Sequence, residues 1–220
     1  MLFLSDFLLL HGIRLSLIMA LIGLGFAIYL IKVIVASPPG NDRMKQIAGA
    51  IEEGAKAYLN RQVITISLIA VVILLLLFKF KDVPTSIGFV IGAACSLSAG
   101  YIGMRIAVLA NTRTTQAATV SRHTALKVAF NGGAVTGLLV VGLALLAVGI
   151  FFLGVWHIMQ SEDSAVKSLI GLALGASLIS VFARLGGGIY TKAADVGADL
   201  VGKIESNLDE DDPRNPATIA

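Results

Sequence analysis

The chain consists of long apolar blocks separated by shorter polar segments. Each block is close to the roughly 20 residues that a helix needs to cross a bilayer. The pattern therefore predicts an all-α integral membrane protein, a polytopic helical bundle with about five transmembrane helices forming one membrane domain over residues 1–220. The predicted spans are Leu15–Val35, Val63–Phe80, Ile87–Ala110, Ala134–Trp156 and Ser168–Tyr190.

Composition agrees with a membrane protein. Hydrophobic residues make up 56% of the chain and charged residues 14%, whereas about one quarter of a soluble domain is charged. The single cysteine, Cys95, lies in an apolar block and cannot form an internal disulfide. The net charge of +3 comes without a cluster of arginines and aromatic residues, so we expect no nucleic-acid partner.

Basic residues predict how the chain crosses the membrane. The N-terminal stretch lacks a basic start and is too long for a cleaved signal peptide, so a retained first span is favoured over a signal. Lys and Arg gather in the segment after the first span and around the end of the third span and beyond, which places those segments in the cytoplasm. The N-terminus is then expected outside, and residues 191–220 inside. The basic residues concerned are Arg43, Lys45, Lys56, Arg61, Arg105, Arg113, Arg122 and Lys127.

The spans differ in the size of their side chains. Spans three to five are rich in Gly, Ala and Ser, which let membrane helices approach closely, so we expect them inside the bundle. Span two consists of large aliphatic residues and is expected to face lipid. The segment before it, MKQIAGAIEEGAKAYLNRQ, has apolar residues at helical spacing and predicts an extension of span two out of the membrane. Its Glu52 and Glu53 are expected to be solvated or ion-paired.

An acidic block follows the fifth span, and part of it has helical spacing. Lys192, Asp195, Asp199 and Lys203 would form one polar stripe on a helix. Two carboxylates four residues apart destabilise a helix unless a positive group lies between them. Mg²⁺ accepts one or two carboxylates together with phosphate oxygens, and lysines bind phosphate as point charges. The stripe therefore predicts a magnesium–phosphate site, with a solvated, salt-bridged helix end as the alternative.

The same segment contains a false nucleotide motif. GADLVGK, at 197–203, satisfies the phosphate-loop pattern, but Ile204 replaces the required Ser or Thr and no strand precedes it. Asp199 would also repel a phosphate held there. We therefore reject a nucleotide-binding loop.

Arg184 is a charge within the fifth span. Such a residue either faces a bundle interior or water-filled cavity, where it marks an ion path, or extends its side chain to the inner interface. Its position along the chain favours neither alternative. The glycines at 186–188 follow it directly and allow close approach of a neighbour or bending of the helix.

The residues after the fifth span resemble a known signature. GGGIYTKAADVGADLVGK followed by EDDPRNPATIA closely resembles the signature of membrane-bound, ion-translocating inorganic pyrophosphatases. The resemblance covers nearly the whole chain and is weakest before about Arg43. Three more stretches resemble the same family: IAGAIEEGAKAYLNRQ, GAACSLSAGYIGMRIAVLANTRTTQAA and AFNGGAVTGLLVVGLALL.

This resemblance implies roles for the acidic block. Lys192 is expected to bind pyrophosphate, and Asp195 and Asp199 to ligate magnesium that bridges to it. Lys203 is expected near phosphate and Glu210 near metal. The implied cofactor is Mg²⁺, with K⁺ as a further candidate. The implied assembly is a homodimer embedded in membrane lipid, in the bacterial inner membrane.

The resemblance also implies that the chain is an N-terminal fragment of a larger multi-span fold. The family's acidic motif continues into further aspartates, so the groups that position the attacking water are expected beyond Ala220, and the fragment alone is expected to be inactive. Arg184 matches the arginine at the ion gate. The expected function is coupling of magnesium pyrophosphate hydrolysis to proton export, with sodium as the alternative ion. A passive divalent-cation transporter or a non-catalytic membrane subunit is the alternative from another class.

Overall fold

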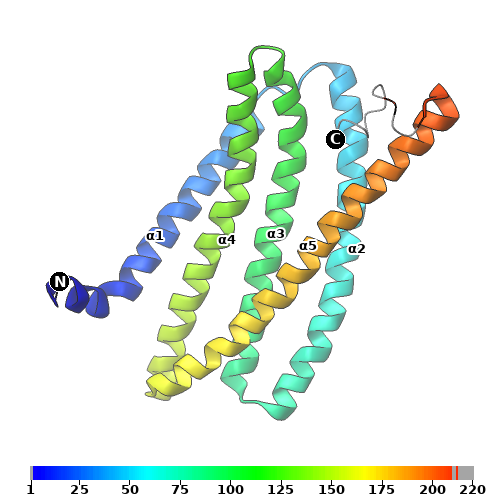
Figure 1. Cartoon of the computed structure of the whole chain (residues 1–220). Helices are drawn as coiled ribbons and strands as arrows, with labels where there is room; N and C mark the ends of the chain where they lie inside the picture. Colours follow the sequence, from blue (N-terminus) through cyan, green and yellow to red (C-terminus); the bar gives the residue numbers. More distant parts are fainter. Residues whose placement is uncertain (1, 210–211, 213–220) are drawn as a thin grey trace. The chain divides into compact units, whose positions relative to one another are not determined.

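The computed structural model describes residues 2–209 and 212, with side chains from His11 onward. In this part of the chain all regular structure is helical, and all five helices are long and apolar enough to cross a membrane. The expected all-α membrane fold is therefore confirmed. The helices are α1 (Leu2–Ala36), α2 (Asp42–Phe80), α3 (Val83–Ala118), α4 (Arg122–Met159) and α5 (Glu162–Ser206) (Figure 1).

The helices run beyond the apolar blocks because the polar segments beside them are helical too. Asn41 begins α2 by accepting a hydrogen bond from the Met44 N–H at 2.9 Å. The segment before the second span therefore continues into that span without a break, as its helical spacing predicts. Ser121 begins α4 in the same way, accepting from the Thr124 N–H at 3.1 Å, so only residues 119–121 separate α3 from α4.

The chain divides into two compact units, residues 1–180 and 181–220. The first unit holds α1 to α4 and the beginning of α5. Within it α4 packs against both α1 and α3, and α2 packs against α3 (Figure 1). The core between α1, α3 and α4 consists of aliphatic side chains: Ala27, Leu30, Ile34, Ala99, Ile106, Ala110, Val135 and Leu139.

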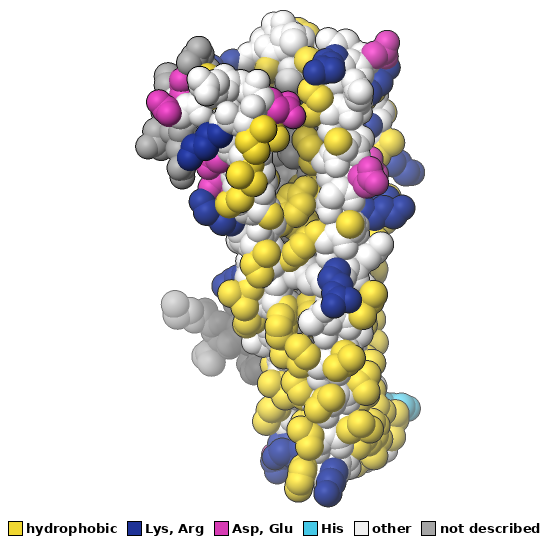
Figure 2. Space-filling model, turned by 90° about the vertical axis from the view of Figure 1, so that its right-hand side faces the viewer, with side chains coloured by type: hydrophobic (Ala, Val, Ile, Leu, Met, Phe, Trp, Pro, Cys, Tyr) yellow, Lys and Arg dark blue, Asp and Glu magenta, His cyan; other side chains and the backbone are white. Residues whose placement is uncertain are grey.

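The α2 helix is the most exposed of the five. Only 6% of its most apolar window is buried, against 28% in α3 and in α4. Figure 2 shows hydrophobic side chains over the middle and lower part of the face it draws. On α2 itself, the exposed large hydrophobic side chains include Ile64, Leu68 and Leu75. This distribution is the one expected for a helix whose aliphatic side chains face lipid, as predicted for span two.

Arg113 ties α3 to the end of α1. Its guanidinium donates hydrogen bonds to the Leu109 carbonyl at 2.8 Å and to the Val35 carbonyl at 3.3 Å. The last carbonyls of a helix have no partner within that helix and carry partial negative charge. The arginine therefore satisfies one of these groups on α1 while remaining on α3.

The first part of α5 lies against α3 through glycines on both helices. Gly88 and Gly92 on α3 face the turns of α5 that hold Ser168 and Leu172, and a Cβ at Gly88 would come within 2.9 Å of the Ser168 carbonyl oxygen. A Cβ at Gly92 would overlap the Leu172 carbonyl outright. Likewise, a Cβ at Gly171 or at Gly175 of α5 would overlap backbone atoms of α3. The two backbones can pack this closely only because these positions lack side chains.

Replacing Gly92 by Ala should separate α3 from α5. The added methyl group meets a backbone carbonyl, which cannot rotate away, so we expect a loss of about 1–3 kcal/mol in the free energy of unfolding. Gly100→Ala is the matched control on α3, because nothing lies within 4 Å of a Cβ at that position. Thermal unfolding of the chain in detergent micelles, followed by circular dichroism, measures both. Equal melting temperatures for the two variants would contradict the close contact.

Asp82 begins α3 in the turn between α2 and α3. Its carboxylate accepts a hydrogen bond from the Thr85 N–H at 2.8 Å, and Pro84 lies in the first turn of the helix. This backbone hydrogen bond, more than the nearby Lys81 charge, holds the pKa of Asp82 below its usual value. The charged carboxylate is therefore the form that stabilises the start of α3.

This lowered pKa makes stability depend on pH in one direction. The contribution of Asp82 is fully present above its unfolded pKa of about 3.9 and is lost as pH falls through the lower folded pKa. Asp82→Asn keeps a capping oxygen but no titrating group. We expect the melting temperature of the wild-type chain to exceed that of Asp82→Asn at pH 7, and the difference to shrink by pH 3. A difference that does not change with pH would show that the charge is unimportant.

Candidate functional site

The polar stripe lies on α5 within the second unit. Because α5 is helical through Ser206, Lys192, Asp195, Asp199 and Lys203 fall on one continuous helix. At 3.6 residues per turn, their directions around the axis lie within roughly 80° of each other. The helix then ends at Asn207, whose φ of 49° is left-handed, and the Leu208 N–H donates to the Gly202 carbonyl at 3.0 Å.

Lys192 and Asp195 form an ion pair. The Lys192 ammonium donates to Asp195 Oδ2 across one turn, a pair that the three-residue spacing predicts. The lysine side chain is 73% exposed and the aspartate side chain 35%. An ion pair this accessible to water contributes little to stability. Both groups are therefore accessible to a ligand of suitable charge.

The other two members of the stripe lie one and two turns further along. Asp199 is half-buried and Lys203 is exposed, in the last turn of α5. Asp195 and Asp199 are like charges at the spacing that is unfavourable on a helix. A divalent cation between them would remove this repulsion. The four residues therefore lie on one helix, as their spacing predicts, while the magnesium–phosphate site stays a prediction.

The carboxylates present fit a metal that is shared with its ligand. Among residues 2–209 and 212, no group of three or more His, Cys, Asp or Glu side chains is close enough to hold a metal ion alone. Mg²⁺ commonly uses one or two carboxylates and takes its remaining ligands from water and phosphate. Asp195 and Asp199 can supply the protein's share. The predicted metal position Glu210 lies outside the described residues.

The GADLVGK segment at 197–203 is part of α5. Backbone N–H groups within a helix are already bonded to carbonyls four residues earlier, so they cannot cradle a phosphate as a phosphate loop does. The structure therefore supports rejecting a nucleotide-binding loop here.

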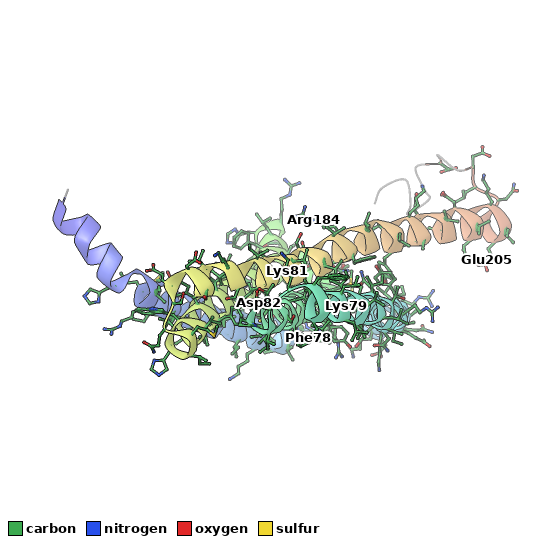
Figure 3. The ribbon with its side chains drawn as sticks, turned by 90° about the horizontal axis from the view of Figure 1, so that it is seen from below. Phe78, Lys79, Lys81, Asp82, Arg184 and Glu205 are labelled. Carbon is green, nitrogen blue, oxygen red and sulfur yellow. The ribbon has the colours of Figure 1, made fainter. Side chains whose placement is uncertain are left out.

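Arg184 also lies on α5 in the second unit, ahead of the stripe. Its side chain is exposed, and Figure 3 draws it extending from the helix. The neighbouring positions 187 and 188 have open space around them, since nothing lies within 4 Å of a Cβ at Gly187 or Gly188. Both alternatives for Arg184, a place on an ion path and a place at the membrane interface, stay predictions.

The turn between α2 and α3 carries charged and aromatic side chains. Figure 3 places Phe78, Lys79, Lys81 and Asp82 together there. The capping role of Asp82 has a recognisable signal, an aspartate directly before Val-Pro-Thr. Sequence reasoning did not use that signal.

These features define an integral membrane protein with a charged segment in the C-terminal part of its fifth helix. The profile of a family described as inorganic H⁺ pyrophosphatase matches residues 21–220. The chain therefore belongs to this family, as its signature segment predicts.

Curated relatives agree with this membership. The chain is 54% identical over 202 residues to a K⁺-insensitive pyrophosphate-energized proton pump of Methanosarcina mazei, covering 91% of the chain and 29% of the relative. It is 44% identical over 210 residues to a protein of the same name from Caldanaerobacter subterraneus, covering 87% and 29%. It is also 44% identical over 218 residues to a K⁺-stimulated pyrophosphate-energized sodium pump of Thermotoga maritima, covering 91% and 30%. The chain thus spans less than a third of these relatives' length.

The exposure of the Lys192–Asp195 pair leads to a stability prediction. Lys192→Gln should change the free energy of unfolding of the ligand-free chain by less than about 1 kcal/mol, because water screens the pair. Lys167→Gln is the matched control, since Lys167 forms an exposed ion pair with Asp163 at the other end of α5. Thermal unfolding in micelles should give similar small shifts for both. A large loss for Lys192→Gln alone would mean that the pair is structural.

Proposed function

We propose that this chain forms the part of a pyrophosphate-energised proton pump that holds the first magnesium and phosphate ligands. The observation that carries the proposal is the row of two carboxylates flanked by two lysines on one helix. The row lies in a chain that is 54% identical to a pump named for this activity. The remaining ligands and the groups that position water are supplied by the rest of the pump.

In this proposal Asp195 and Asp199 hold magnesium against the substrate. Their carboxylates would hold the metal, and pyrophosphate oxygens would supply further ligands. Bound magnesium supplies charge neutralisation to the phosphates and lowers the pKa of bound water. The protein's own contribution is to keep two carboxylates on one face of a helix.

The lysines meet the negative charge of pyrophosphate. Lys192 is paired with Asp195 in the ligand-free chain. With substrate bound, the Lys192 ammonium would pair with a phosphate oxygen, and the Asp195 carboxylate would be available to hold the metal. Lys203 lies about three turns beyond Lys192 on the same helix and would bind phosphate in the same way. Because the exposed pair is weak, this exchange costs little.

Transport requires that filling the site changes the path of the ion. Moving one charge against the membrane potential costs about 2.3 kcal/mol per 100 mV. We propose that Arg184 changes its partner during the cycle, since it lies on the same helix as the metal ligands. We favour protons as the transported ion and expect no requirement for K⁺, because the Methanosarcina and Caldanaerobacter relatives are named K⁺-insensitive proton pumps.

The test uses a complete pump. The aligned segment of the Methanosarcina mazei relative is replaced by this chain, and the chimera is reconstituted into vesicles. We expect magnesium-dependent hydrolysis of pyrophosphate, with acidification of the vesicle lumen in the absence of sodium and potassium. Asp195→Asn should lower hydrolysis by at least about 100-fold because the metal loses a ligand. It should also abolish the thermal stabilisation by magnesium pyrophosphate.

Controls separate the proposed roles. Asp163→Asn removes a carboxylate from the exposed ion pair at the other end of α5 and should leave hydrolysis unchanged. Arg184→Gln should lower the number of protons moved per pyrophosphate more than it lowers hydrolysis. Stabilisation by magnesium alone, without a further effect of pyrophosphate, would instead indicate a divalent-cation carrier. Sodium uptake without acidification would overturn the choice of ion.

The site is proposed to face the cytoplasm, and the complete pump to be a homodimer in the bacterial inner membrane. Light scattering of the purified chimera measures its mass. A monomeric mass would contradict the dimer without affecting the assignment of the site.

A further inference from the structure

A groove with a volume of about 690 Å³ runs between α3 and α4 in the first unit. Its lining is apolar along its whole length. On α3 it extends from Val83 and Pro84 to Cys95, and on α4 from Ile158 to Leu143. The groove therefore begins at the α2–α3 turn and runs toward the middle of both helices.

The length of the groove corresponds to one leaflet. The 12 steps from Val83 to Cys95 cover about 18 Å at 1.5 Å per residue. Half of a typical hydrocarbon core is about 15 Å. An acyl chain that starts at the turn would therefore reach the end of the groove near the bilayer midplane.

The width of the groove favours a hydrocarbon chain over a helix as its occupant. A volume of about 690 Å³ along a length of about 18 Å gives a mean cross-section of roughly 38 Å². A helix with its side chains is about 10 Å across, or roughly 80 Å². The groove accommodates an extended hydrocarbon chain along its length, whereas a helix could fill it only with part of its side-chain surface.

The outer end of the groove is next to cationic and aromatic side chains. Lys79 and Lys81 lie in the turn that leads directly into Val83 (Figure 3). The Lys79 ammonium lies 5.4 Å from the centre of the Phe80 ring, which is 70% exposed. The one carboxylate of this turn, Asp82, accepts a hydrogen bond from the Thr85 N–H and keeps its negative charge. With two lysines and one carboxylate the turn has a net charge of +1, which attracts an anion at the depth where lipid phosphates lie.

We propose that the α3–α4 groove binds one acyl chain of an anionic phospholipid, whose phosphate lies against Lys79 and Lys81. The inference depends on membrane insertion alone and is independent of the proposed hydrolysis. The apolar lining holds the chain by van der Waals contact, because lipid gives no hydrophobic drive. The two lysines supply the preference for a headgroup with net negative charge.

The experiment measures lipid retained by the chimeric pump. The protein is purified in detergent with phosphatidylglycerol or phosphatidylcholine, and native mass spectrometry counts the lipids that remain bound. We expect one phosphatidylglycerol per chain and at least about fivefold less phosphatidylcholine. Gly154→Leu should reduce phosphatidylglycerol retention at least about fivefold, because Gly154 lines the groove and has open space for a side chain.

Matched variants keep the result interpretable. Gly137→Leu adds the same side chain to an open position of α4 outside the groove and should leave retention unchanged. Replacing both lysines by Gln should equalise the two lipids. Hydrolysis of pyrophosphate by each variant reports whether the pump has folded. Equal retention by wild type and Gly154→Leu, no retained lipid, or equal binding of both lipids to wild type would each overturn the proposal.

Discussion

In lipid, α3 and α5 gain no hydrophobic free energy by associating, so their contact depends on how closely their backbones approach. Gly92 on α3 and Gly171 on α5 permit that approach, because any side chain there would meet a carbonyl of the other helix. The beginning of α5 is thereby held on α3 within the first unit. The first turns of α5, the helix that carries the charged stripe, are consequently held in place against α3.

The charged stripe relies on weaker forces than this contact. The Lys192–Asp195 pair is open to water and contributes little to folding. A site built from such pairs can release its internal partners and accept a charged ligand without a large loss of stability. The contrast between a tightly packed helix contact and loosely paired charges is typical of a rigid framework that carries a reactive segment.

The proposed lipid groove lies on another part of the framework. It is formed by α3 and α4, and its outer end is the turn where Asp82 begins α3. The carboxylate of Asp82 caps α3 and keeps its negative charge, so it offsets part of the positive charge of the neighbouring lysines. The excess of lysine over aspartate in this turn is what would attract an anionic lipid.

The sequence by itself determined the five membrane helices, since block length against bilayer thickness leaves few alternatives. It also determined the stripe from Lys192 to Lys203, because helical spacing sets which residues share a face. The position of Glu210 near the metal stays a prediction that rests on the resemblance alone. Only the tertiary structure decided that Gly92 packs against α5 while Gly100, on the same glycine-rich helix, does not. The hydrogen bond from Arg113 to the Val35 carbonyl is also known only from the tertiary structure, and so is the α3–α4 groove. They depend on which faces of separate helices meet, and periodicity within one helix carries no information about its partner's register.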